Sequence, residues 1–357
     1  HRTRWIIGGM LALALGAFMA ACALPIFPQS FAMGLAVSIM AYTLIGLGVG
    51  ASGTSLLALL ATTTAPHRRA AAATITWLMM IFGIAATAGT VGQFIDPYSP
   101  TLLIKIVGIV VNIATLVTCI AVWRIERTLI AIREPDPTPF REGLKGVWSE
   151  RKARNFTIFV FLSMTAYFMQ ELILEPYAGL VFGFTPGQST SLSGAQNGGV
   201  FLGMLSVGIL ATGLKIGALR NWVMTGCVGS ALALILITFL GPIGPSAPLV
   251  PAVVLLGFFN GMFAVAAIGS MMALAAQGAT RREGTRMGLW GAAQAIAAGF
   301  GGLVGAGLVD VLRLSMSDTQ AFGIVFIAEA ALFIAAATMA AKIMDRRMPS
   351  ATLVPGE

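Results

Sequence analysis

The sequence predicts an all-α, polytopic membrane protein, and three observations support this class. Hydrophobic residues make up 57% of the 357 residues and charged residues only 10%, whereas soluble domains carry about 25% charged residues. The apolar residues form continuous runs of roughly 20 or more, which is the length that spans a bilayer as a helix. These runs lack the alternation of polar and apolar residues that a membrane β-barrel requires.

Ten runs are long enough to span the membrane. In chain order they are residues 5–27, 31–64, 70–95, 101–123, 155–184, 193–214, 221–241, 246–278, 283–312 and 319–343. The second and the eighth are long and rich in glycine, which predicts close helix contacts or bending there. The three cysteines lie in separate runs without metal-site spacing, and we interpret them as small packed hydrophobic residues.

The basic residues predict the orientation of the chain, because Lys and Arg favour cytoplasmic loops. Alternate connections, counted from the first residues, hold 20 of the 22 Lys and Arg, and only Lys105 and Arg313 lie near the opposite face. Both ends and the central loop are therefore expected in the cytoplasm. The net charge of +8 is explained by this topology, so it does not indicate nucleic-acid binding.

An internal repeat predicts the architecture. The run SLLALLA at 55–61 resembles SMMALAA at 270–276, and Trp77 corresponds to Trp290 at nearly the same offset. Each run leads to an Arg-Arg pair, and the following helices share two glycines and an aspartate. The offset pairs the first four helices with the last four and leaves 155–184 and 193–214 unpaired. We infer a twelve-helix protein of two parallel halves, the architecture of the major facilitator superfamily, with its first two helices absent from this chain.

This arrangement predicts three segments. Residues 1–123 form the N-terminal half (helices 3 to 6 of the fold), 124–154 a cytoplasmic linker, and 155–357 the C-terminal half (helices 7 to 12). In the linker, Phe140, Leu144, Val147 and Trp148 share one helical face, which is consistent either with an amphipathic stretch on the membrane surface or with a solvated connector.

The most informative polar residues lie in the run 155–184. Tyr167, Glu171 and Glu175 are spaced four apart and share one helical face, with Gln170 and Tyr177 nearby and Pro176 next in sequence. An ionised side chain inside the membrane is disfavoured by roughly 3 kcal/mol on insertion scales, so it usually faces a cavity or a partner. We predict a polar binding face; the alternative is an anchor near the membrane surface that only fixes packing.

Other polar residues interrupt the later runs. Gln196 and Asn197 lie next to small residues and could bind a ligand across a helix contact or serve packing alone. Glu329 is central in its run, where it could face a partner or a cofactor, or be a hydrogen-bonded interior acid. Asn260 and Gln294 are single polar residues for which interhelical hydrogen bonding is the simplest interpretation.

The sequence does not suggest an enzyme. Its two histidines, His1 and His67, lie in expected cytoplasmic loops, so no histidine within a predicted span can bind a metal ion. A magnesium tetrapyrrole bound in the membrane would therefore need an oxygen ligand such as Glu, Gln, Asn or water. It contains no phosphate-binding loop, no serine-hydrolase elbow, no zinc-protease motif and no aspartate pair for prenyl transfer.

Several segments resemble the PucC family of bacteriochlorophyll delivery proteins. They are QELILEPYAGLVFG (170–183), LSGAQNGGVFLGML (192–205) and TRREGTRMGLWGAAQAIAAGFGG (280–302), with ITWLMMIFGI (75–84) and RWIIGGM (4–10) in agreement. The resemblance covers essentially the whole chain. It departs from the family pattern at the N-terminus, where the first two helices are missing.

The resemblance implies a facilitator-fold protein of the inner or photosynthetic membrane of phototrophic bacteria that assists assembly of light-harvesting antennae. The implied partners are antenna polypeptides, the reaction centre and pigment-synthesis enzymes, together with membrane lipid, and the implied ligand is bacteriochlorophyll a. It supplies no catalytic residues. A proton-coupled transporter of a small or amphipathic substrate is the alternative function.

Overall fold

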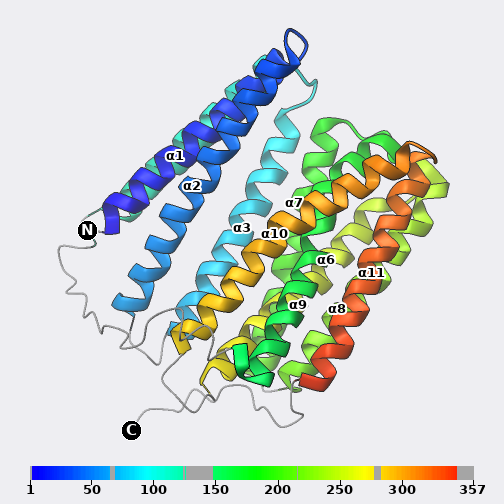
Figure 1. Cartoon of the computed structure of the whole chain (residues 1–357). Helices are drawn as coiled ribbons and strands as arrows, with labels where there is room; N and C mark the ends of the chain where they lie inside the picture. Colours follow the sequence, from blue (N-terminus) through cyan, green and yellow to red (C-terminus); the bar gives the residue numbers. More distant parts are fainter. Residues whose placement is uncertain are drawn as a thin grey trace. The chain divides into compact units, whose positions relative to one another are not determined.

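The computed structural model describes residues 2–64, 69–123, 125, 148–214, 216–276 and 283–343, and these residues are helical apart from short connections (Figure 1). Ten of the described helices are long and apolar enough to cross a membrane, which confirms the predicted spans. The chain divides into two compact units. One comprises residues 1–75 and 93–135, and the other comprises 76–92 and 136–357.

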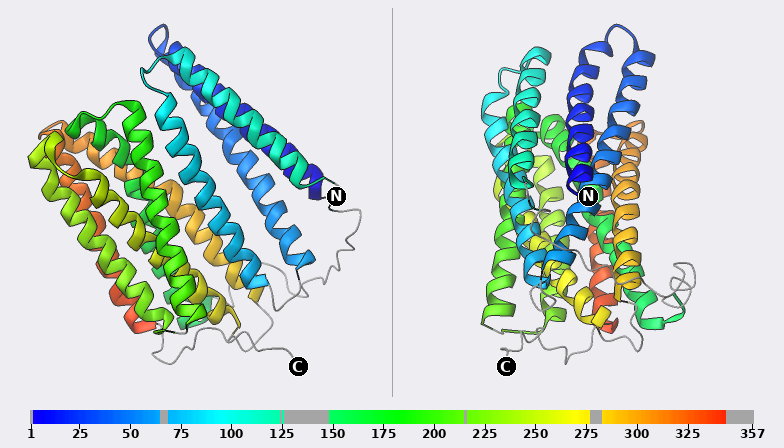
Figure 2. Two further views of the ribbon diagram at one scale, coloured as in Figure 1. Left: turned by 180° about the vertical axis from the view of Figure 1, so that it is seen from behind. Right: turned by 90° about the vertical axis from the view of Figure 1, so that its left-hand side faces the viewer.

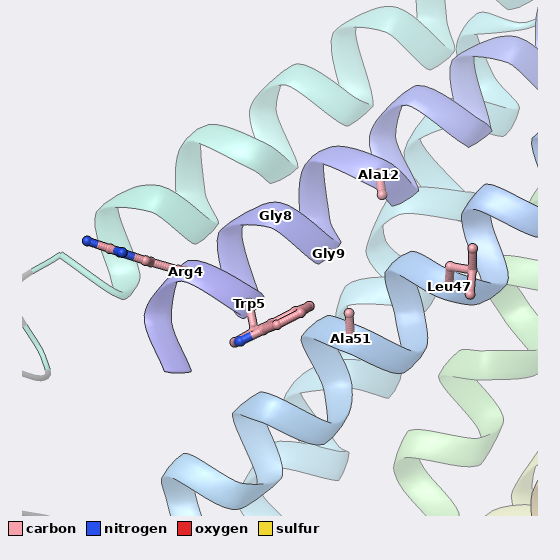
Figure 3. Close-up of a pocket in the computed structure, with 7 residues that line it drawn as sticks. All are labelled: Arg4, Trp5, Gly8, Gly9, Ala12, Leu47 and Ala51. Atoms are coloured by element: carbon pink, nitrogen blue, oxygen red, sulfur yellow. The ribbon is translucent and has the colours of Figure 1, made fainter. Parts of the chain in front are cut away.

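The first unit contains α1 (Arg2–Ala23), α2 (Phe31–Thr63) and α4 (Pro100–Ala121), and α1 packs against both α2 and α4 (Figure 2). Glycine allows α1 and α2 to approach closely. A Cβ atom at Gly9 would lie 2.6 Å from the Ser52 nitrogen, and one at Gly16 would lie 2.7 Å from the Ala41 oxygen. Beside this contact, a groove of about 520 Å³ is lined by residues of α1 and α2, with Arg4 and Trp5 at one end (Figure 3).

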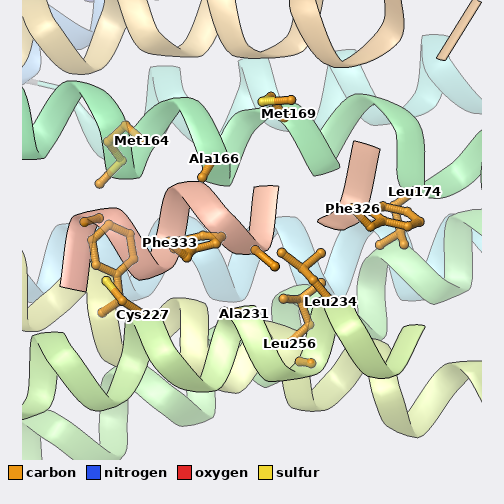
Figure 4. Close-up of a cluster of buried hydrophobic side chains, with 14 of the residues drawn as sticks. Met164, Ala166, Met169, Leu174, Cys227, Ala231, Leu234, Leu256, Phe326 and Phe333 are labelled. Atoms are coloured by element: carbon orange, nitrogen blue, oxygen red, sulfur yellow. The ribbon is translucent and has the colours of Figure 1, made fainter. Parts of the chain in front are cut away.

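The second unit is a bundle of six helices to which the middle of α3 (Arg69–Phe94) is added. The six are α6 (Arg151–Phe182), α7 (Pro186–Val207), α8 (Leu219–Leu240), α9 (Leu249–Ala276), α10 (Glu283–Arg313) and α11 (Asp318–Ile343). Its core is rich in alanine, phenylalanine, leucine and valine (Figure 4), and aromatic rings from α6, α9 and α11 meet within it. Van der Waals packing of this kind holds helices together where lipid offers no hydrophobic driving force.

The contact between α7 and α9 depends on glycines in both helices. A Cβ atom on Gly199 or Gly203 would overlap backbone atoms of α9, and one on Gly257 or Gly261 would overlap carbonyl oxygens of α7. Small residues at matching positions let the two backbones touch, as in other membrane helix pairs. Of the glycines in 246–278, Gly257 and Gly261 permit close contact at this interface, whereas Gly269 faces the Leu219 side chain of α8.

Tyr177 fixes the C-terminal part of α6 within the bundle. Its ring is fully buried and lies 4.9 Å from the ring of Phe326, centroid to centroid, and its hydroxyl donates a hydrogen bond of 2.9 Å to the Ile237 carbonyl. Gly183 then ends the helix in the left-handed conformation, with φ of 72°, which glycine adopts without steric cost.

The contacts agree with the predicted repeat. In the first unit α1 packs on α2 and α4, and in the second unit α8 packs on α9 and α11. Gly16 of α1 and Gly229 of α8 are separated by the repeat offset of 213 residues, and each faces the helix that follows its own. The two units therefore share a local packing pattern as well as a sequence pattern.

The largest difference from the expected spans is the start of α7, which begins at Pro186 instead of 193. Thr185 caps the helix: its hydroxyl accepts from the Gln188 backbone N–H, and the Gln188 side chain accepts from the Thr185 N–H. The first two turns are rich in serine, so an apolar run does not reveal them. Most of the linker lies outside the described residues, including Phe140, Leu144 and Val147 of its expected amphipathic face.

We expect Gly203→Ala to destabilise the bundle by about 1–3 kcal/mol, because overpacking a tight interface carries a cost of that order. Gly198 of the same helix has open space around its Cβ position, so Gly198→Ala serves as the matched control and should leave stability unchanged or slightly raised. Thermal unfolding in detergent measures both. Equal midpoints for the two variants would contradict the role given to Gly203.

Candidate functional site

The candidate site is a polar face where α6 meets α7 in the second unit. Glu171 and Glu175 lie one turn apart on α6 and are exposed, while Ile173 and Leu174 on the other side of the helix are buried in the core. Tyr167, one turn before Glu171, is half-buried. The predicted i, i+4, i+8 face therefore exists on α6 as one continuous surface.

The helix α7 supplies the other side of this face. Ser193 donates a hydrogen bond of 2.5 Å to the Glu175 carboxylate, and the Asn197 side-chain amide donates one of 3.0 Å to the Ser193 carbonyl. We call Tyr167, Glu171, Glu175, Ser193 and Asn197 the α6–α7 polar face. Ser193 was not among the residues predicted from sequence, although its position four residues before Asn197 places it on the same helical side.

Glu171 is the unsatisfied member of the α6–α7 polar face. Within the described part of the chain, no hydrogen bond or ion pair involves its carboxylate. An exposed carboxylate in a membrane span without a partner is unfavourable. Its oxygens are therefore the atoms most available to a ligand or to a partner chain.

Gln196 and Asn197, which were expected to act together, point to different neighbours. Gln196 is 8% exposed, and its backbone carbonyl packs against Gly257 of α9. Asn197 is half-buried and belongs to the α6–α7 polar face. Adjacent residues on a helix are about 100° apart, so one faces α9 while the other faces α6.

The structure separates the remaining predicted residues from this face. Gln170, Tyr177, Asn260 and Glu329 are all at most 1% exposed, inside the bundle of the second unit. Gln294 is half-buried on α10. Of the ten candidates, Tyr167, Glu171, Glu175 and Asn197 belong to the α6–α7 polar face.

The donor atoms of the α6–α7 polar face are all oxygen and nitrogen, without imidazole or thiolate. Among the described residues the Glu171 carboxylate has no hydrogen-bond partner, and the Asn197 amide nitrogen donates to the Ser193 carbonyl, so the Asn197 amide oxygen is the atom of that group still available as a donor to a metal ion. Oxygen donors suit Mg²⁺, so these residues fit the magnesium of a tetrapyrrole. The described residues contain no group of three or more His, Cys, Asp and Glu that could hold a metal ion by themselves.

Sequence comparison places the chain beside photosynthesis proteins. The model of the family described as "PUCC protein" matches residues 1–348. The "Bacteriochlorophyll synthase 44.5 kDa chain" of Rhodobacter capsulatus is 65% identical over 348 residues, which cover 97% of this chain and 81% of that protein. The "Protein PucC" of Cereibacter sphaeroides is 28% identical over 90% of this chain and 71% of its own length. The chain spans 58% of a third relative, the "Uncharacterized protein in puhA-bchM intergenic region" of Rhodobacter capsulatus, at 28% identity.

Solved transporters share the fold. The major facilitator superfamily transporter FucP in its outward conformation aligns over 97% of this chain and 84% of its own, with a TM-score of 0.60 and 14% identity. A POT family transporter in complex with a thioalcohol-conjugated peptide aligns over 96% and 82%, with a TM-score of 0.70 and 14% identity. These likenesses confirm the predicted facilitator-type fold and concern the fold alone.

We expect Ser193→Ala to lower stability by about 1 kcal/mol, because it removes the hydrogen-bond donor of Glu175. Ser206→Ala is the matched control, since the Ser206 hydroxyl donates only to the Leu202 carbonyl of its own helix. Each serine variant is unfolded chemically or thermally, alone and in combination with Glu175→Gln. The difference between the combined and the summed single effects measures the coupling energy between that serine and Glu175. If Ser193 and Glu175 show additive effects, the contact between them contributes nothing.

Proposed function

Because the chain belongs to the PucC family, we propose that it is an assembly factor for bacterial light-harvesting antenna complexes. In this role it binds bacteriochlorophyll, antenna polypeptides or both within the membrane. The family match over 348 residues and the relative named for bacteriochlorophyll support this role. The chain is a multi-pass membrane protein, and we place it in the inner or photosynthetic membrane of a bacterium with both ends in the cytoplasm.

The observation that carries the proposal is the unpartnered Glu171 on the α6–α7 polar face. Beside it, Glu175 and Asn197 are already oriented by Ser193. A face with one free carboxylate and several oriented polar groups is suited to bind a polar atom that enters from the membrane. We propose that an oxygen atom of Glu171 or Asn197 would hold the magnesium of bacteriochlorophyll a, and that the other of these two residues and Tyr167 would flank the ring. The bound pigment would supply light absorption and not a reaction.

Antenna polypeptides are the second ligand that this face could accept. A single membrane helix with a hydrogen-bond donor near its middle would satisfy Glu171, since interhelical hydrogen bonds are a common source of specificity in membranes. We propose that polypeptide and pigment meet here, and that the reaction centre and pigment-synthesis enzymes are more distant partners.

We propose a role without turnover, although one relative carries "synthase" in its name. The polar groups of the face comprise two carboxylates, a hydroxyl, a phenol and an amide, and the sequence offers no motif that binds a phosphorylated or prenylated substrate. Incubation of the purified protein with pigment precursors checks this directly, since product formation would assign catalysis.

Proton-coupled transport is the alternative, and the carboxylates of α6 are the observation in its favour. Transport predicts flux of a substrate that is lost when Glu171 is made neutral. Assembly predicts co-purification with pigment or antenna chains in the absence of any flux. The absorption spectrum of gently purified protein separates the two, because pigment bound in a stable ratio favours assembly.

We expect replacement of Glu171 and Glu175 by leucine to reduce pigment or antenna polypeptide retained by the protein about tenfold, the equivalent of 1.4 kcal/mol. Replacement by glutamine should have a smaller effect, because the amide keeps an oxygen donor. The measurements are antenna absorbance in cells that carry each variant and pigment per purified protein. Asn112→Leu is the control, since the Asn112 amide donates to the Gly108 carbonyl of its own helix. Normal antenna levels in the leucine variant at normal protein abundance would exclude this face as the binding site.

A further inference from the structure

Besides the indole nitrogen of Trp290, three polar side chains in the described interior of the second unit have atoms without a partner. They are Gln170 of α6, Asn260 of α9 and Glu329 of α11, each at most 1% exposed. Among the described residues, no hydrogen bond reaches the side-chain oxygen of Gln170, the side-chain nitrogen of Asn260 or either carboxylate oxygen of Glu329. Buried polar atoms are almost always hydrogen-bonded in native proteins, so these four atoms require an explanation.

Gln170 and Glu329 lie at the same level of the bundle. Leu174 of α6 lies at the level of Phe326 of α11, and Ala166 lies at the level of Phe333, as Figure 4 shows. Gln170 is midway between Ala166 and Leu174 on the same buried face, and Glu329 is between Phe326 and Phe333 on the face that these rings share. Because α6 and α11 pack against each other, the two unsatisfied side chains occupy facing positions.

Asn260 reaches this level from α9. The rings of Phe263 and Phe333 are 6.0 Å apart, and Asn260 and Glu329 each precede one of these rings by about one helical turn. The helices α9 and α11 both run antiparallel to α8 and are therefore parallel to each other. Asn260 and Glu329 thus lie on the same side of the contact between Phe263 and Phe333. The Ser230 hydroxyl of α8 donates to the Asn260 oxygen at 2.7 Å, which leaves the Asn260 nitrogen as the group without a partner.

The charge of Glu329 decides whether this layer is favourable. An ionised carboxylate only accepts hydrogen bonds, so the neutral side-chain amides of Gln170 and Asn260 alone would have to stabilise its negative charge, and a buried charge without an opposite charge is strongly disfavoured. A carboxylic acid donates through its hydroxyl and accepts through its carbonyl. Its hydroxyl can satisfy the Gln170 oxygen, and its carbonyl can accept from the Asn260 nitrogen, directly or through one water.

We propose that Glu329, Gln170 and Asn260 form a buried proton-binding site in which Glu329 is a neutral carboxylic acid. This site is separate from the α6–α7 polar face and does not depend on the assembly role. The charged surroundings agree with it. Cations in the described parts of the surrounding helices lie at their ends, and the nearest on α11 is Lys342, 13 residues or about 20 Å from Glu329. Among the buried members of this core, the titratable side chains are Tyr177 and Cys227, and the Tyr177 hydroxyl donates to the Ile237 carbonyl.

Infrared spectroscopy of the full chain in detergent at neutral pH tests the proposal. The wild-type protein should show the carbonyl stretch of a protonated carboxylic acid, and Glu329→Gln should lose it. The exposed Glu175→Gln is the matched control and should keep the band. Gln170→Leu and Asn260→Leu should each shift the band, because each removes one hydrogen-bond partner of the acid.

Carboxyl-labelled glutamate provides the same measurement without substituting Glu329, if Glu329→Gln does not fold. The acid band of the wild-type protein should then move on labelling and shift again in Gln170→Leu. Absence of an acid band in the labelled wild-type protein would show an ionised Glu329 and overturn the proposal. A band that is present but unchanged in both leucine variants would overturn the assignment of Gln170 and Asn260 as its partners.

Discussion

The structure depends on one constraint: polar groups inside a bilayer must find their partners within the protein, because lipid offers none. The helices meet this constraint for the backbone. Buried hydroxyls meet it locally, since Thr157, Ser163 and Ser270 each donate to the carbonyl one turn earlier in the same helix. Most buried hydroxyl groups are thus hydrogen-bonded within their own helix. The few polar side chains without such a bond indicate where a helix needs a partner on another helix or outside the protein.

The positions of glycines determine where two helices pack closely and where polar side chains can lie between them. Where α7 meets α9, the two backbones touch at glycines, so there is no room for a side chain at those glycine positions. Where α7 meets α6 the contact is looser, and Ser193 and Asn197 occupy it. Gly199 and Gly203 of α7 therefore lie on the side that packs closely against α9. Ser193 and Asn197 lie on the side toward α6, where the α6–α7 polar face forms.

The sequence predicted much of this arrangement and missed specific parts for physical reasons. Spans and repeat follow from apolar run length and from matched residues, which are properties of the chain alone. The i, i+4, i+8 face of α6 was also predictable, because helical spacing fixes it. The separation of Gln196 from Asn197, and of Gln170 from Glu171, was not predictable, because it depends on which helix lies on each side. The start of α7 was missed since its first turns are held by the Thr185 cap and not by hydrophobicity.

Three acids, Glu171, Glu175 and Glu329, lie within described spans, and none of them forms an ion pair with a described cation. Each must therefore be accommodated differently. Glu175 accepts a hydrogen bond from Ser193, so its charge is partly compensated within the bundle. Glu329 is fully buried and neither of its carboxylate oxygens has a described hydrogen-bond partner, which is the basis for the neutral acid proposed above. Glu171 has neither solution within the described chain, and this is the physical reason to look for its partner outside it.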